Sequence, residues 1–216
     1  QRRVFWSENT LLYRYRWSKG DRIVHWAIHR PPPDLRPGPY WFFVSIYWCP
    51  KPLDFRYLPV VNSHGEPMGT EIYLGPTIVR ALGTPNKPHR ANFEDNMELL
   101  GYDLSQKSYR PGQEVELTLY WQGRQKLDRD YTVFVHLLDG HQRIVGQHDS
   151  YPDNGRFPTS YWLPGETVMD SHTLRMPDSL QPGNYTLAVG LYYLPTGTRL
   201  GGDSMVVRLP LAVEGD

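Results

Sequence analysis

Glycine and proline punctuate the whole length of this chain, and their spacing limits the folds open to it. The 19 glycines and 20 prolines together make 39 of the 216 residues, well above the average share of about 12%. The longest stretch free of both is Gln1–Lys19. Since a helical core needs many uninterrupted segments of about 11–12 residues, this distribution excludes a helical bundle.

Composition and charge exclude several further classes. Hydrophobic residues make 39% and aromatic residues 13% of the chain, enough for a packed core and against disorder. Lys plus Arg and Asp plus Glu both number 23, so nothing calls for nucleic acid or an anionic membrane. The single Cys49 excludes an intrachain disulfide and a multi-cysteine metal site. The longest apolar run, Tyr40–Cys49, is too short to span a bilayer.

From Phe93 onward, short apolar segments alternate with turn residues about every 8–12 positions, as is typical of a β-sandwich. Within most segments the apolar residues recur at every second position. The predicted strands are Val115–Trp121, Tyr131–Leu138, Arg143–His148, Thr167–Met176, Tyr185–Tyr193 and Met205–Val213. Phe134 and Leu138 fall opposite the other apolar residues of their strand, so we expect that strand to be covered on both faces.

The N-terminal part is less regular. Its predicted strands are Arg22–Arg30, Tyr40–Trp48 and Glu71–Val79, and 83–90 has the composition of a linker. We therefore expect two tandem antiparallel sandwich modules of immunoglobulin-like or jelly-roll type, 1–88 and 89–216, the first one incomplete.

An internal repeat supports the two modules. A shift of 145 residues sets Tyr15–Trp48 on Ser160–Tyr193 without a gap. The matched positions include Trp17 with Trp162, Gly20 with Gly165, Pro37-Gly38 with Pro182-Gly183, Tyr40 with Tyr185, and Val44 with Val189. We expect structural roles for Trp17, Trp162, Tyr40, Tyr185 and Gly183.

The repeat also indicates that the first copy lacks part of its sandwich. On this repeat the first copy lacks the strands that match Val115–Trp121 and Tyr131–His148, and we expect a chain that begins with Gln instead of Met to be a piece of a larger product. Exposed strand edges and apolar faces are disfavoured in a free monomer. We therefore expect other subunits, or an upstream membrane part, to complete residues 1–88.

The second copy resembles a known β-sandwich module. The matching positions are Leu100-Gly101-Tyr102, Pro111-Gly112, Tyr120-Trp121, Phe134-Val135-His136, Pro158-Thr159, Trp162, Pro164-Gly165, Pro182-Gly183-x-Tyr185, Gly190-Leu191-Tyr192 and Gly197-x-Arg199-Leu200. They are similar to the extracytoplasmic C-terminal domain of bacterial polyprenyl-phosphate-sugar-type membrane glycosyltransferases and related surface proteins. The resemblance covers Phe93–Val213 and implies an extracytoplasmic, envelope- or membrane-associated domain without catalytic residues.

Two groups of polar residues are weighed as metal ligands. His136 and His148 lie on strands joined by a turn, and Asp149, Asp153 and Asn154 follow. They could form a zinc or calcium site. The alternative is two half-exposed strand histidines and a polar turn, since the spacing matches no compact zinc pattern and no EF-hand loop. We predict no metal and no other cofactor, with calcium as the weaker alternative.

Aromatic residues are the other candidates for contact with a ligand. Tyr120, Trp121, Tyr161, Trp162, Tyr192 and Tyr193 could stack on sugar rings or form the core. Phe157 and Tyr161 lie in the long loop 149–162, and loops often carry binding residues. The candidates for ligand contact are Phe157, Tyr161, Tyr120 and Tyr192.

No motif for nucleophilic catalysis is present. The chain has no G-x-S-x-G, and Cys49 has no basic neighbour that would activate its thiol. We therefore expect a non-catalytic extracytoplasmic domain that contacts glycan or docks to neighbouring subunits of an envelope or membrane complex. The alternatives are an accessory part that shapes the acceptor site of a membrane glycosyltransferase, and a structural surface-layer or filament subunit.

Overall fold

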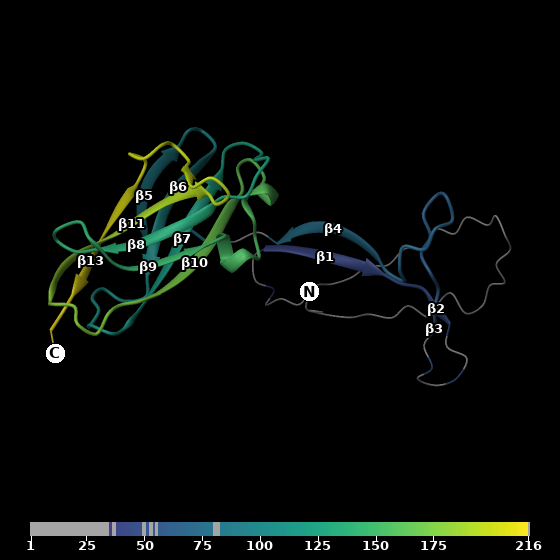
Figure 1. Ribbon diagram of the computed structural model, residues 1–216, viewed down its shortest axis with the longest axis horizontal. Coiled ribbons are helices and arrows are strands. Elements are labelled where there is room, and N and C mark those ends of the chain that lie inside the picture. The colour runs from purple at the N-terminus through teal and green to yellow at the C-terminus, as the bar shows by residue number, and fades with distance from the viewer. Residues whose placement is uncertain are drawn as a thin grey trace. The chain divides into compact units, whose positions relative to one another are not determined.

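The computed structural model describes residues 35, 38–48, 51, 54, 56–79 and 83–215 (Figure 1). In these residues the fold is almost entirely β. Two short 3-10 turns, η2 (Pro152–Gly155) and η3 (Thr159–Tyr161), lie in the loop 151–166 between two strands. The described part contains no helix that is long and apolar enough to cross a membrane.

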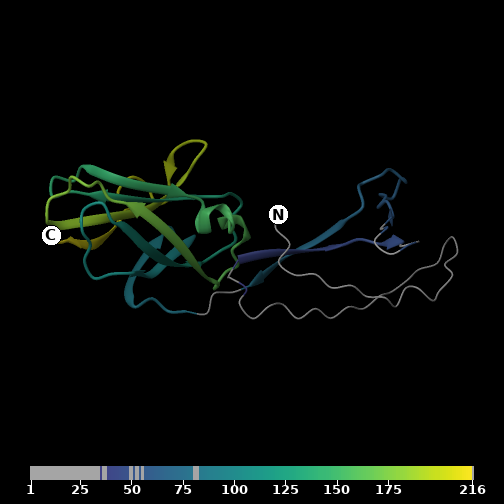
Figure 2. The same cartoon turned by 90° about the horizontal axis from the view of Figure 1, so that it is seen from below.

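Residues 87–213 form a sandwich of two antiparallel sheets (Figure 1 and Figure 2). One sheet has the order β10-β7-β6-β5, and the other has the order β12-β11-β8-β9 with β13 added on β11. The strands of the first sheet are β5 (Lys87–Phe93), β6 (Met97–Leu104), β7 (Glu114–Gly123) and β10 (Thr167–Arg175). Those of the second are β8 (Thr132–Leu138), β9 (Ile144–Ser150), β11 (Gly183–Tyr193), β12 (Thr198–Arg199) and β13 (Val207–Val213).

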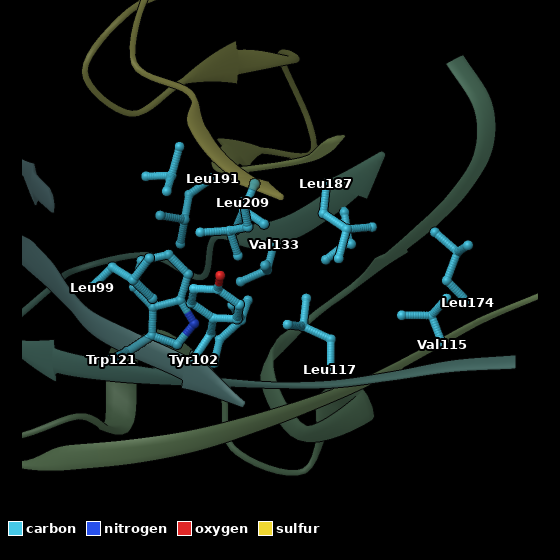
Figure 3. Close-up of a cluster of buried hydrophobic side chains, with 14 of the residues drawn as sticks. Leu99, Tyr102, Val115, Leu117, Trp121, Val133, Leu174, Leu187, Leu191 and Leu209 are labelled. Carbon is cyan, nitrogen blue, oxygen red and sulfur yellow. The ribbon is translucent and has the colours of Figure 1, made fainter. Parts of the chain in front are cut away.

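The core lies between the inner faces of these sheets (Figure 3). Period-two alternation turns Leu117 and Trp121 of β7 inward, and they pack in one cluster with Val133, Leu187 and Leu209 of the other sheet. Trp121 is completely buried. The predicted sandwich and its six predicted strands are therefore confirmed, and the outer residues of β8 are covered as expected.

Three strands of the sandwich were not predicted: β5, β6 and the two-residue β12. β5 occupies Lys87–Phe93, so the second half of the predicted linker 83–90 is paired strand instead. Both β5 and β6 carry irregular register, between Pro88 and Ala91 and between Leu99 and Gly101. Such bulges interrupt the alternation by which the other strands are recognised.

Residues 38–79 form two small antiparallel sheets. β1 (Gly38–Val44) pairs with β4 (Ile72–Val79), and β2 (Tyr47–Trp48) pairs with β3 (Arg56–Tyr57). The strand predicted at 71–79 is confirmed, whereas the one predicted at 40–48 is divided into β1 and β2, which belong to separate sheets. Exposed large apolar side chains gather here: Phe42, Val44, Ile46, Tyr57, Leu58, Val61, Met68, Ile72, Tyr73 and Leu74.

The repeat has a structural counterpart in two strand starts. β1 begins at Gly38 and β11 begins at Gly183, with φ of 140° and 156°. Both values lie in the region that favours glycine. Trp17, Cys49 and the predicted strand Arg22–Arg30 lie outside the described residues. The division into 1–88 and 89–216 stays a prediction.

Candidate ligand-binding site

A cluster of polar and aromatic side chains lies on the outer face of the five-stranded sheet. Alternation along β8 directs Val133 and Val135 into the core, so Phe134 and His136 point to the opposite face. Asp149 of β9 is paired with Phe134, and Gly190 of β11 is paired with Phe134 from the other side. The register of three strands thus brings distant parts of the sequence together.

Phe134 forms the apolar base of this cluster. A Cβ atom at Gly190 would lie only 2.5 Å from the Phe134 ring, so the ring occupies the space that the glycine leaves. The guanidinium carbon of Arg199 in β12 lies 5.0 Å from the centre of the ring, a cation–π arrangement. The His136 ring lies 4.8 Å from the Phe134 ring, centre to centre. Phe134 itself is only 2% exposed.

Asp149 is the polar centre of the cluster. The Tyr192 hydroxyl donates a hydrogen bond of 3.2 Å to Oδ2 of Asp149, and His136 Nε2 lies 3.3 Å from Oδ1. Burial raises the pKa of Tyr192, and the charge and hydrogen bond of Asp149 raise it further. The phenol therefore stays protonated and keeps donating to the carboxylate at neutral pH. The two neighbours fix the carboxylate while leaving part of it exposed.

The charges of the cluster balance. The negative charge of the Asp149 carboxylate is balanced by the positive charge of the Arg199 guanidinium. Arg199 also donates one hydrogen bond, from Nη1 to the backbone oxygen of Asp203 at 3.2 Å. A carboxylate accepts about four hydrogen bonds and a guanidinium has five N–H donors, so both groups keep capacity for a ligand. We call Phe134, His136, Asp149, Tyr192 and Arg199 the outer-face cluster.

Of the four predicted contact residues, only Tyr192 belongs to this cluster. Phe157 was expected to be exposed because it lies in a loop, but it is only 3% exposed and packs edge-on against Trp162. Tyr120 is 5% exposed, and its hydroxyl donates to Asp103 Oδ2 at 2.8 Å. Phe157 is therefore a core residue, and the side chain of Tyr120 is buried as well. Tyr161 is half-buried at the end of η3.

The predicted structural residues of the sandwich hold its turns in place. Trp162 is 1% exposed, and its indole Nε1 donates to the Phe157 carbonyl at 3.0 Å. The Tyr185 hydroxyl donates to the carbonyl of Gln181 at 2.9 Å, across the turn before Gly183. Outside the sandwich, Tyr40 is paired with Thr77 of β4.

The five candidate metal ligands do not form one group, although His136 and Asp149 meet on the outer face. His136 points to the outer face, whereas His148, paired with the inward Val135, points into the core. Asp153 forms an ion pair with Arg156, and Asp153 and Asn154 both adopt positive φ in the η2 turn. The described residues contain no group of three or more His, Cys, Asp or Glu side chains that could hold a metal ion.

Sequence reasoning missed four members of the outer-face cluster as ligand contacts: Phe134, His136, Asp149 and Arg199. The signal that was available is the alternation in 132–138, which sets Phe134 and His136 on the face opposite the core. Their partners on β9, β11 and β12 depend on strand register, which the sequence does not state.

Comparison with known proteins returns distant structural likenesses. No family model and no curated protein matches the chain. The chain is similar to the C-terminal domain of Wzt, with a TM-score of 0.42 and 10% identity, over 62% of this chain and 83% of that one. It is also similar to the CARDB domain of the PF1109 protein from Pyrococcus furiosus, with a TM-score of 0.34 and 12% identity, over 62% of this chain and 95% of that one.

Proposed function

We propose that the sandwich is a non-catalytic binding domain that holds a neutral glycan on the outer face of its five-stranded sheet. The observation that carries the proposal is the fixed carboxylate of Asp149, held by Tyr192 and His136 beside the Arg199–Phe134 stack. These side chains stand on paired strands, so the sheet places them before any ligand arrives. Such preorganisation lowers the cost of binding.

The hydrogen-bonding capacity of the cluster fits sugar hydroxyls. A hydroxyl both donates and accepts, and the exposed oxygens of Asp149 accept while the free N–H groups of Arg199 donate. Because the two charges cancel, the cluster favours an uncharged ligand over an anion or a cation. Ligand sites of this kind place a few polar groups beside apolar surface.

The cluster also supports a role without catalysis. Hydrolysis of a glycosidic bond by the usual mechanism needs two carboxyl groups on either side of the bond. The outer-face cluster holds one, Asp149, and its two neighbours are Tyr192 and His136.

The resemblance of the motif string supports an extracytoplasmic location, in the cell envelope or beside a membrane. In that setting the domain acts as an accessory part of a membrane glycosyltransferase or a related surface protein, where it contacts glycan near the acceptor site. A ligand there is a growing or finished surface polysaccharide.

A second candidate function, docking to a neighbouring subunit, is supported by the apolar surface of residues 42–74. Ten large apolar side chains are exposed along this segment, and a surface rich in exposed apolar side chains is typical of interaction sites. Sedimentation of the full chain beside a Val44→Ser, Leu74→Ser variant tests whether a second copy is the subunit. Self-association that the variant abolishes supports docking, and a monomer at every concentration contradicts docking between copies.

A glycan array followed by titration calorimetry on the full chain tests the binding function. Tyr192→Phe removes one hydrogen bond to Asp149 and should weaken binding by about five- to tenfold, for a loss of about 1 kcal/mol. Asp149→Ala should weaken it further. Tyr193→Phe is the matched control, because the neighbouring residue on a strand points to the opposite face. Binding that is equal in all four proteins, or no binding to any neutral glycan, contradicts the proposal.

A further inference from the structure

A buried hydrogen-bonded cluster joins the edges of the two sheets. His148 Nδ1 lies 3.0 Å from His172 Nδ1, and His172 Nε2 lies 2.8 Å from Asp170 Oδ2. Asp170 also accepts from Trp121 Nε1 at 3.3 Å and from the backbone N–H of Asp153 at 2.9 Å. β9 and β10 are the end strands of their sheets, so the bond between the histidines connects one sheet to the other.

The bond between the two imidazoles depends on their protons. The carboxylate of Asp170 accepts a hydrogen bond from Nε2–H of His172, so in the neutral ring Nδ1 of His172 is the acceptor. His148 Nδ1 is then the donor. One added proton can be balanced by the carboxylate of Asp170. With a second added proton, both Nδ1 atoms carry hydrogen, and two cations face each other across 3.0 Å.

We propose that this cluster is an acid-sensitive latch, which holds β9 against β10 near neutral pH and opens when both imidazoles are protonated. The side chains of His172 and Asp170 have no exposure and His148 is half-buried, so water screens the repulsion between the rings only in part. β9 has a single strand neighbour, β8, and the latch adds a hydrogen-bonded link to the other sheet. Opening removes this link, so that β9 separates more readily from β8.

The groups that face His148 set the direction of the pH response. Burial lowers the pKa of His148, the charge of His172 lowers it further, and Asp170 and Asp149 oppose the change. Asp153, from the η2 turn packed on β10, contributes its N–H to Asp170 and keeps its carboxylate paired with Arg156. Since the closed state binds the proton less readily than the open one, its stability falls as the pH drops below about 6.5.

One peptide bond joins His148 of the latch to Asp149 of the outer-face cluster. His148 points into the core and Asp149 points outward to Tyr192 and His136. Movement of β9 on opening displaces the Asp149 carboxylate from both partners. If the proposed function holds, acid therefore weakens glycan binding; the latch itself does not depend on that function.

Hydrogen exchange of the full chain without any glycan tests the latch. The amides of Ile144–Ser150 are compared at about pH 7.5 and about pH 5, on either side of the ordinary histidine pKa, after correction for intrinsic exchange. EDTA is present so that no metal bridges the rings. Protection of β9 should fall by about tenfold or more at the lower pH, while the centre of β7 stays protected.

Two variants make the result specific. His148→Gln keeps a side-chain N–H donor without a titrating ring, so the protection of its β9 should not depend on pH. His141→Gln removes an exposed histidine from the turn between β8 and β9 and should respond like the wild type. Equal β9 protection at both pH values in the wild type, or an undiminished pH response in His148→Gln, overturns the latch.

An NMR titration of the wild-type histidine rings provides a reading that needs no variant. It should place the His148 pKa below about 6.5, and a higher value overturns the proposal. Glycan binding is then measured separately at both pH values. A latch that opens without any glycan binding at neutral pH contradicts the proposed function alone.

Discussion

Replacing Trp162 with alanine tests how the loop 151–162 is anchored to the sandwich. The indole is 1% exposed, packs against Phe157 and donates to the Phe157 carbonyl. Burying about 200 Å² of aromatic surface at 25 cal/mol/Å² is worth about 5 kcal/mol. The substitution also leaves a carbonyl without its donor, whereas partial collapse of the cavity recovers part of the loss. We expect Trp162→Ala to lower the free energy of unfolding by about 3–5 kcal/mol.

Calorimetric and denaturant unfolding of the full chain measure this loss. For a sandwich of this size, the expected melting shift is about 6–20 °C. Trp162→Phe keeps most of the buried area and should lose about 1–2 kcal/mol, mainly for the missing hydrogen bond. Leu163→Ala, at a neighbouring side chain that is 41% exposed, is the control and should change stability by less than about 0.5 kcal/mol. A loss below about 1 kcal/mol for Trp162→Ala would refute the core role of the indole.

Three further predictions concern separate parts of the sandwich. Gly190→Ala should destabilise it by about 1–3 kcal/mol and weaken glycan binding, because the new methyl group displaces the Phe134 ring; unchanged stability and binding would contradict this. EDTA should leave the melting temperature unchanged, since Asp149 and Asp153 already have protein partners; a drop that calcium reverses would establish a metal site. Burial, with the hydrogen bond and charge of Asp103, raises the pKa of Tyr120 to about 12. The contribution of Tyr120 to the free energy of unfolding should therefore fall as the pH rises above about 10. Ultraviolet titration should show a tyrosine that ionises at higher pH than the others and that is missing in Tyr120→Phe.

The sequence predicted the strands whose inner and outer residues alternate without interruption. In β7, apolar and polar residues alternate from Val115 to Trp121, and the structure buries one set. β5 and β6 escaped prediction because bulges at Pro88–Ala91 and Leu99–Gly101 shift the pattern. A single inserted residue exchanges the faces, so a strand with a bulge loses its periodic signal.

The candidate site was harder to predict because it depends on register. Asp149 and Tyr192 are 43 positions apart in sequence, yet β8 lies between their strands and brings them into contact. Loop position misled the prediction for Phe157, since this loop is itself anchored by a buried aromatic pair with Trp162. The sequence did not indicate a role for His172 and Asp170 either, because polar residues at core positions look like interruptions of an apolar pattern.

The most direct test of the account is to map a bound glycan on the full chain by NMR. A neutral glycan selected on the array is titrated into isotope-labelled protein while backbone and side-chain signals are followed. We predict shifts at Phe134, Asp149, Tyr192 and Arg199, with β7 and β10 unaffected. Shifts confined to the outer face of β7 and β10, or no shifts with any neutral glycan, would contradict the assignment of the outer-face cluster as the binding site.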